Sequence, residues 1–386
     1  MNKILGFLRA QGRKYWAWAI RLFVLWLIVG AVYPVSHRAP LQPPQIVQTR
    51  HQQVCVHTDL KDEVDEWKIQ RSLQLVREMG ATTIVEFFPW AYAESNEDQY
   101  RWYQFDRITR HAQNQGIRVI ARLGLVPDWA RPAETTLNYL PEESFDDFVQ
   151  FAVDFATRYE GIVDDIIIWN EPNLGFEWGY QEVLPERYVR LLQAVYQPLH
   201  DANPNMNVLA GALAPTLEPV GSPHGMNDLI YLEGLYQAGA ADYFDTLAVH
   251  AYGLEQPQSA EPDEESLNFR RIELVREVMQ RYDDEETPII VTESGWNDNP
   301  RWTLAVRPSQ RIANTIDAFH WADEHQNWIE NLCIWVLRYP RDTGRYPDNW
   351  TLITPNFQLK PIYYAIQNYA LGQESEGTLW LPPPAS

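Results

Sequence analysis

The sequence predicts a single (β/α)8 barrel, an α/β fold of eight parallel strands, in residues 54–386. Short runs rich in β-branched residues alternate with longer amphipathic stretches from residue 54 onward, the pattern of β-α-β units in a parallel sheet. There are eight such runs, and eight parallel strands are the number that closes this kind of barrel. The 386 residues are compatible with one large domain of this class.

The predicted strands are 54–57, 83–87, 117–121, 165–169, 207–211, 246–250, 288–292 and 332–336. Helices are predicted over 144–159, 270–281, 309–322 and 360–370. In the first of these, aromatic residues recur on one face behind Ser144, which can serve as an N-cap. A doubly wound open sheet is the alternative, but no glycine-rich phosphate loop follows the first run.

Residues 1–38 predict a signal peptide or an uncleaved N-terminal membrane anchor. Several lysines and arginines precede an apolar stretch, 15–35, that is interrupted only by Arg21. Its uninterrupted part has the length of a signal peptide, whereas the whole stretch is just long enough to span a membrane. Residues 39–53 read as a proline-containing stalk. Because positive charge favours the cytoplasmic side, we expect a barrel outside the cytoplasmic membrane, either anchored or secreted.

Composition excludes several classes of partner and site. The chain has 31 Lys+Arg against 52 Asp+Glu, a net charge of -21 that repels phosphate backbones, so nucleic acid is not an expected partner. We expect a monomer.

The two cysteines, Cys55 and Cys333, fall on the first and last predicted strands. They read more readily as small packing residues than as a disulfide, although export leaves the disulfide open.

Two glutamates follow the predicted strands at the end where a barrel of this type builds its site. The fourth strand runs into WNEPN at 169–173 and the seventh into TESGW at 292–296, so Glu171 and Glu293 should share one face. One glutamate at a strand end is often only a partner in a loop ion pair. Cleaving an acetal, however, needs a proton donor and a second carboxylate, and this pair supplies both.

These motifs resemble those of the clan A glycoside hydrolases, in which the acid/base follows strand four in an Asn-Glu-Pro motif and the nucleophile follows strand seven. The segments PWAYAE at 89–94, YRWYQFD at 100–106, PDWA at 127–130 and VHAYG at 249–253 extend the resemblance over nearly all of the predicted barrel. Family 39 is the nearest, with family 5 close behind. The resemblance implies a glycosidase that needs no cofactor or metal, with Glu171 as acid/base and Glu293 as nucleophile.

The implied mechanism retains the anomeric configuration. Glu171 has to hold a proton, which the negative charge of Glu293 favours, and it can become the base once Glu293 is glycosylated and that charge has gone. Retention requires carboxyl groups about 5 to 5.5 Å apart, against roughly 6.5 to 9.5 Å for inversion.

The resemblance also implies substrate-binding residues. Asn170 would hydrogen-bond the sugar 2-hydroxyl, while His250 and Tyr252 would approach from strand six, Tyr252 as the partner of Glu293. Five tryptophans that follow strands are expected as apolar platforms for sugar rings. They are Trp90, Trp129, Trp178, Trp296 and, foremost, Trp335. The second strand lacks the arginine found in many clan members, so Arg122 or Glu86 is expected to support the nucleophile instead.

Three functions compete at this point. The first is a retaining hydrolase of β-linked oligo- or polysaccharides outside the cell, for which we favour endo cleavage. The second is a non-catalytic carbohydrate-binding barrel tethered at the cell surface. The third, a metal-dependent hydrolase, would need histidines and aspartates clustered at strand ends, where only His57 and His250 occur among histidines.

Overall fold

The computed structural model describes residues 16, 18, 20–26 and 44–373. Contacts divide the chain into two units, residues 1–43 and 44–386. The predicted signal or anchor, 1–38, and the first part of the predicted stalk lie largely outside the described residues. Within the predicted signal or anchor, residues 20–26 are described, and they are helical. Within the described ranges, no helix is both long enough and apolar enough to cross a membrane.

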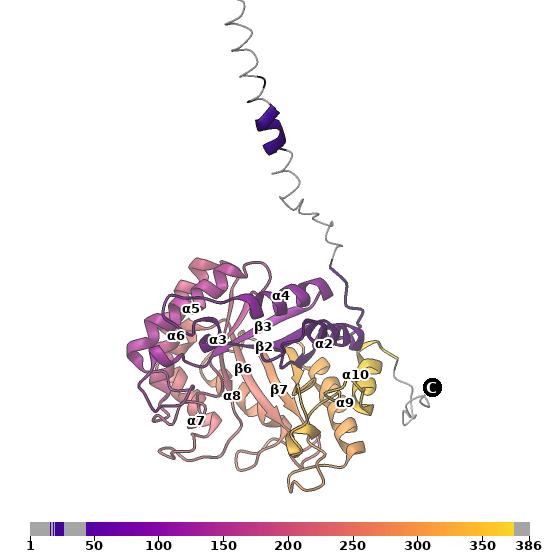
Figure 1. Cartoon of the computed structure of the whole chain (residues 1–386). Coiled ribbons are helices and arrows are strands. Elements are labelled where there is room, and N and C mark those ends of the chain that lie inside the picture. Colours follow the sequence, from indigo (N-terminus) through magenta and orange to yellow (C-terminus); the bar gives the residue numbers. More distant parts are fainter. Residues whose placement is uncertain (1–15, 17, 19, 27–43, 374–386) are drawn as a thin grey trace, which may run out of the picture. The chain divides into compact units, whose positions relative to one another are not determined.

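The second unit contains a closed barrel of eight parallel strands in which each strand pairs with its neighbour in the sequence and β8 pairs with β1 (Figure 1). This confirms the predicted fold class. The strands are β1 (Val54–His57), β2 (Thr83–Pro89), β3 (Arg118–Gly124), β4 (Asp165–Ile168), β5 (Asn207–Leu213), β6 (Thr246–Tyr252), β7 (Ile289–Gly295) and β8 (Ile329–Ile334).

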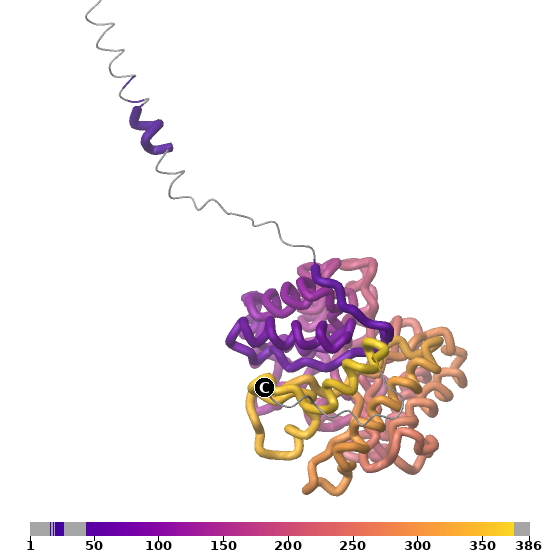
Figure 2. The backbone as a smooth tube through the Cα atoms, turned by 90° about the vertical axis from the view of Figure 1, so that its right-hand side faces the viewer, coloured from indigo at the N-terminus to yellow at the C-terminus, as the bar shows by residue number. Residues whose placement is uncertain are grey.

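Helices surround the barrel, and the four predicted ones coincide with α5, α8, α9 and α10. The helices are α2 (Glu66–Met79), α3 (Trp90–Ala93), α4 (Tyr103–Gln115), α5 (Phe145–Arg158), α6 (Pro185–Ala202), α7 (Asp228–Gln237), α8 (Ile272–Arg281), α9 (Pro308–Glu324) and α10 (Pro361–Ala370). Helix α10 packs beside α2, where the Tyr363 hydroxyl donates to the Leu75 carbonyl at 2.7 Å. The first and last parts of this unit therefore lie side by side, as the indigo and yellow segments in Figure 2 show.

Several strands extend further toward their carboxyl ends than their β-branched runs indicate. Strand β7, for example, continues to Gly295 because Ser294 and Gly295 pair with the end of β6. Glu293 therefore lies inside β7 rather than in the loop after it. Strand β8 begins at Ile329, earlier than predicted, because the polar Glu330 and Asn331 hide its start in the sequence.

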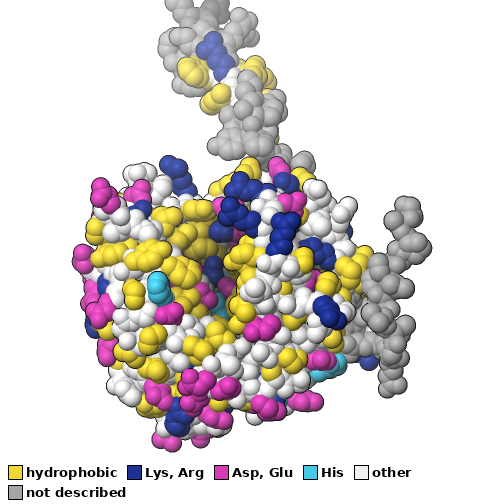
Figure 3. Space-filling model, turned by 90° about the horizontal axis from the view of Figure 1, so that it is seen from below, with side chains coloured by type: hydrophobic (Ala, Val, Ile, Leu, Met, Phe, Trp, Pro, Cys, Tyr) yellow, Lys and Arg dark blue, Asp and Glu magenta, His cyan; other side chains and the backbone are white. Residues whose placement is uncertain are grey.

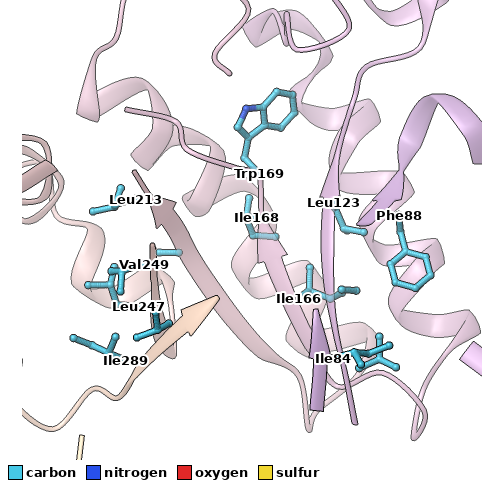
Figure 4. Close-up of a cluster of buried hydrophobic side chains, with 14 of the residues drawn as sticks. Ile84, Phe88, Leu123, Ile166, Ile168, Trp169, Leu213, Leu247, Val249 and Ile289 are labelled. Atoms are coloured by element: carbon cyan, nitrogen blue, oxygen red, sulfur yellow. The ribbon is translucent and has the colours of Figure 1, made fainter. Parts of the chain in front are cut away.

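The core has two layers. Side chains from all eight strands fill the barrel interior in a single cluster: Cys55, Val85, Ile120, Ile167, Leu209, Ala212, Ala248, Ile290 and Cys333. The other apolar faces of the strands pack against the helices in a much larger cluster, part of which is drawn in Figure 4. There Ile166 and Ile168 on β4 lie between Leu123 on β3 and Leu213 on β5. The strands are therefore buried on both faces, by the barrel interior and by the helices.

Cys55 and Cys333 form a disulfide with an S–S distance of 2.11 Å. The expectation that they are only packing residues is therefore wrong. The physical reason is register: Cys55 on β1 is directly opposite Cys333 on β8, and both side chains point into the barrel interior. The bond joins the first strand to the last, across a sequence separation of 278.

Candidate active site

Glu171 lies in the loop that follows β4. The φ angles of Trp169 and Glu171 are 74° and 43°, in the left-handed region that non-glycine residues seldom adopt. Two backbone hydrogen bonds hold this turn: Glu171 N–H donates to the Ala212 carbonyl at 2.9 Å, and Leu174 N–H donates to the Glu171 carbonyl at 2.8 Å. Strained backbone of this kind is kept where it aims a side chain, and here it aims Glu171 across the mouth of the barrel.

Glu293 is placed by β7. It stands opposite His250 on β6, at a register shift between Val249 and His250 that re-aims the side chains at the end of these strands. A carboxylate oxygen of Glu171, one of Glu293 and a ring nitrogen of His250 all lie within 4.8 Å of one another. The two predicted glutamates therefore do meet, at a separation close to that required for retention and shorter than that for inversion.

Both oxygens of Glu293 are held by donors. The Tyr252 hydroxyl donates to Oε2 at 2.6 Å, and Nη1 of Arg122 donates to Oε1 at 3.1 Å. Burial, together with the negative charge of Glu293, raises the pKa of Tyr252 well above its usual value, so the phenol stays protonated and remains a donor. The Glu293 carboxylate is thus fixed in one orientation within a buried site.

Arg122, on β3, contacts Glu293 and Asn170. Its Nη1 also donates to Oδ1 of Asn170 at 2.8 Å, and its guanidinium carbon lies 4.4 Å from the centre of the Phe87 ring. Glu86, the other residue expected for this task, is turned to the loop after β1, where it accepts from the Thr58 hydroxyl at 2.5 Å and from the Leu60 N–H at 3.0 Å. Arg122, and not Glu86, therefore contacts Glu293, and it places a positive charge beside that carboxylate.

His250 joins the two glutamates. Its Nδ1 lies 2.7 Å from Oε1 of Glu171 and 3.7 Å from Oε2 of Glu293. Burial lowers the pKa of His250, but the charge of Glu293 and the hydrogen bond to Glu171 outweigh burial and raise it overall. Nδ1–H therefore donates to Glu171. Among the described residues, Oε2 of Glu171 has no hydrogen-bond partner.

His57 is the last residue of β1 and points toward Glu293. Burial and the nearby charge of Arg122 lower the pKa of His57 well below its ordinary value, so the ring is neutral. Nδ1–H donates to the Thr58 carbonyl at 2.8 Å, which leaves Nε2 as a buried lone pair without a partner in the described structure, 3.7 Å from Glu293. His57 is thus a hydrogen-bond acceptor aimed at the site and not an ion-pair partner.

Of the five expected tryptophan platforms, Trp335 and Trp129 are half-buried. Trp335 contacts the His57 ring edge-on, with 4.4 Å between ring centres, so it lies at the site. Trp90, Trp178 and Trp296 are at most 1% exposed and offer no open ring face to a sugar. Their expected role as platforms is wrong because each ring is enclosed by packing. The indole of Trp296, for instance, covers Gly253 so closely that any Cβ there would overlap the ring.

Glu177, in the loop after β4, was not singled out from the sequence. Its carboxylate lies beside the Asn170 side chain and lines a cavity of about 150 Å³ with Asn170, Arg122 and Phe87. Burial and the charge of Glu171 raise the pKa of Glu177 to about 7. No spacing rule marks this residue, because its place depends on the path of an irregular loop.

The cluster of Glu171, His250 and Glu293 has donor atoms close enough to hold a metal ion. These atoms are already engaged, however: His250 Nδ1–H points at Glu171, and Glu293 accepts from Tyr252 and Arg122. A fixed guanidinium 3.1 Å from Glu293 also repels a cation. The donor set therefore fits acid–base chemistry better than metal binding.

One face of the molecule has a hollow that contains polar side chains and is bordered in part by hydrophobic ones. Figure 3 shows a face hollowed at its middle, where acidic, basic and histidine side chains meet beside a broad patch of hydrophobic ones.

A cavity of about 970 Å³ lies at the opposite end of the barrel, at the N-terminal ends of the strands. Its lining includes Thr83, Arg118, Asn207 and Thr246. In barrels of this class that end contributes to stability rather than to catalysis.

No protein-family model matches the sequence, and a comparison with curated proteins gives no match. The fold is similar to solved structures. A family 39 glycoside hydrolase from the gut symbiont Bacteroides cellulosilyticus WH2 is 21% identical with a TM-score of 0.67; the match covers 85% of this chain and 65% of that one. This chain thus spans slightly less than two thirds of that protein.

Two further structures have the same fold. For a monomeric beta-xylosidase from Caulobacter crescentus CB15 the identity is 16%, the TM-score is 0.61, and the match covers 84% of this chain and 70% of that one. For a GH5_18 variant from Bifidobacterium longum subsp. longum, in complex with Manb1-4GlcNAc, the identity is 14% and the TM-score is 0.62. That match covers 84% of this chain and 79% of the other. The barrel of this chain is therefore shared with structures from families 39 and 5, the two that its motifs resemble.

Proposed function

We propose that this protein is a retaining glycoside hydrolase in which Glu293 is the nucleophile and Glu171 the general acid/base. The observation that carries the proposal is the pair of carboxylates within 4.8 Å at the catalytic end of the barrel, each with its own set of donors. Two carboxyl groups so close together leave no room for the water that an inverting mechanism activates between them.

In the first step, Glu293 attacks the anomeric carbon as the bond from that carbon to the leaving oxygen breaks. The leaving oxygen takes the proton from Oε2 of Glu171, while Oε1 remains bonded to His250. Tyr252 and Arg122 hold the Glu293 carboxylate in line for attack. The products of this step are a glycosyl ester on Glu293 and a free alcohol.

In the second step, Glu171 takes a proton from water, the water oxygen bonds to the anomeric carbon, and the ester to Glu293 breaks. The carboxylate that leaves is stabilised by the same two donors, Tyr252 and Arg122, since negative charge returns to the oxygens that they contact. Two inversions at one carbon give net retention.

The substrate we propose is an extracellular oligo- or polysaccharide with β linkages. The half-buried Trp335 supports a sugar-binding role, since its ring lies beside the catalytic pair. The names of the similar structures, which include a beta-xylosidase and a complex with Manb1-4GlcNAc, point to the same class of reaction. We propose cleavage within chains rather than at their ends.

The proposed location is outside the cytoplasmic membrane, with the N-terminal segment as anchor or signal. The Cys55–Cys333 disulfide supports this proposal because disulfides persist in oxidising compartments and are rare in the cytosol. Protease treatment of intact cells should degrade the barrel if it faces outward. A barrel that resists protease until the cells are lysed would contradict this location.

The function is tested with the full-length protein on a panel of aryl β-glycosides. We expect Glu293→Gln to abolish turnover and Glu171→Ala to lose it on substrates with poor leaving groups, with azide restoring activity as a β-glycosyl azide. Glu182→Gln, which removes an exposed carboxylate of the loop after β4, is the control and should be fully active. Undiminished turnover by Glu293→Gln would refute the nucleophile; an inactive wild type that binds oligosaccharides would favour the carbohydrate-binding alternative.

A further inference from the structure

A continuous set of contacts leads from the nucleophile position to Glu177. Arg122 donates from Nη1 to Oε1 of Glu293 at 3.1 Å and to Oδ1 of Asn170 at 2.8 Å. The other end of the Asn170 amide meets the carboxylate of Glu177. Asn170 therefore lies between a cation that can only donate and an acidic group on the opposite side.

This arrangement fixes the orientation of the Asn170 amide. With Oδ1 accepting from Arg122, the Nδ2 group is on the side of the amide that faces Glu177, beside which it lines the same cavity. A rotation of the amide by 180° would set its NH2 against the guanidinium and its carbonyl against the carboxylate. With Glu177 ionised, both contacts would be repulsive, so Arg122 and Glu177 together select one orientation, with an Nδ2 hydrogen left for a ligand.

We propose that Glu177 is a positioning residue that holds the Asn170 amide so that its free N–H meets the 2-hydroxyl of the sugar undergoing cleavage. The proposal rests on the function proposed above, because the sugar lies between Glu171 and Glu293. Asn170 directly precedes Glu171 in the chain, so an amide fixed by Glu177 has a fixed position relative to the acid/base.

The surroundings of Glu177 suit this task. The Trp169 indole donates to the Glu177 carbonyl at 2.9 Å, and Asn138 Nδ2 approaches Oε2 at 3.4 Å, so backbone and side chain are both held. The cavity of about 150 Å³ beside Asn170 leaves space for a hydroxyl at this point. Burial and the charges of Glu171 and Glu293 raise the pKa of Glu177, whereas Arg122 and Asn170 oppose the rise.

The test compares variants of Glu177 on two substrates that differ at one atom: an aryl β-glycoside hydrolysed by the wild type and its 2-deoxy analogue. For Glu177→Ala we expect a loss in kcat/KM of about 10- to 100-fold on the first substrate, mainly in kcat, because the 2-hydroxyl contact strengthens in the transition state. On the 2-deoxy analogue, which has no hydroxyl to meet, the loss should stay within about threefold.

Two further variants separate positioning from charge. Glu177→Gln keeps an oxygen that can accept from Asn170 and should recover most of the activity, while a step near pH 7 in the wild-type profile should be absent. Glu182→Gln removes an exposed carboxylate of the same loop and should leave both substrates unaffected.

Equal losses on both substrates for Glu177→Ala would overturn the positioning role and leave the proposed function intact. Failure of Glu177→Gln to recover activity would also overturn it, because charge alone would then account for the effect. If the wild type hydrolysed no aryl glycoside, the proposed function would fail, and the role of Glu177 would fail with it.

Discussion

The disulfide across the barrel seam gives a prediction that does not depend on the substrate. Cys55 and Cys333 link the first strand to the last inside the core, so the bond closes a loop that contains nearly the whole barrel. Replacing both residues by alanine keeps small apolar groups in the barrel interior. It removes the cross-link that restricts the unfolded chain, and we expect the free energy of unfolding to fall as a result.

The magnitude follows from the length of the loop. For a sequence separation of 278, the chain-entropy relation gives about 5.6 kcal/mol at 25 °C. Measured values for native disulfides are typically about 2 to 5 kcal/mol, since the unfolded chain retains some structure. We therefore expect Cys55→Ala/Cys333→Ala to lose roughly 2 to 5 kcal/mol.

The assay is unfolding in guanidinium chloride, followed by tryptophan fluorescence, with and without a reductant. Reductant should lower the transition midpoint of the wild type because the unfolded chain is then no longer cross-linked. It should have no effect on the double variant, which serves as the matched control. If the free energies of unfolding of the oxidised wild type and the double variant agreed within about 1 kcal/mol, the disulfide between β1 and β8 would not stabilise the barrel and the prediction would be refuted.

Three further predictions concern the site. Tyr252→Phe removes one hydrogen bond to Glu293 but keeps the ring against Trp350, so kcat/KM should fall by about 10- to 100-fold with little change in stability; an unchanged rate would show that this bond does not assist Glu293. The pKa of His250 is raised in the folded protein, so protonation of its imidazole stabilises the fold. This stabilisation is fully present below about pH 6.5, the pKa of an unfolded histidine, and is lost as the pH rises through the pKa of His250 in the folded protein. His250→Gln should therefore cost more free energy of unfolding at pH 5.5 than at pH 8.5, and the opposite trend would contradict a protonated imidazole. Because the donor atoms of Glu171, His250 and Glu293 are already engaged, a chelator such as EDTA should leave activity intact, and a loss that metal restores would favour the metal-dependent alternative.

Much of the fold follows from local patterns in the sequence. The β-branched runs mark all eight strands because strands buried on both faces must be continuously apolar, and the alternation with helices specifies a parallel sheet. Strand ends are less visible. Glu293 and Ser294 are polar, yet they belong to β7 because their backbone pairs with β6, a long-range contact that no local pattern records.

The site was predictable where a residue lies near the carboxyl end of a strand, and not where its role depends on packing. Glu171 and Glu293 meet because parallel strands bring their carboxyl ends together. Trp90 and Trp296 also follow or end strands, but surrounding side chains enclose their rings, and position in the chain does not reveal this. Predicting the disulfide would have required knowing the register of β1 against β8. Predicting the place of Glu177 would have required knowing the path of the loop after β4.

The central claim is a glycosyl intermediate on Glu293. It is tested most directly by incubating the full-length protein with an activated 2-deoxy-2-fluoro aryl β-glycoside, which slows release of the sugar, and then mapping peptides by mass spectrometry. We predict one fluorosugar per chain, attached to Glu293, with loss of activity in proportion to labelling. Attachment to another residue, or hydrolysis with inversion and no adduct, would contradict it.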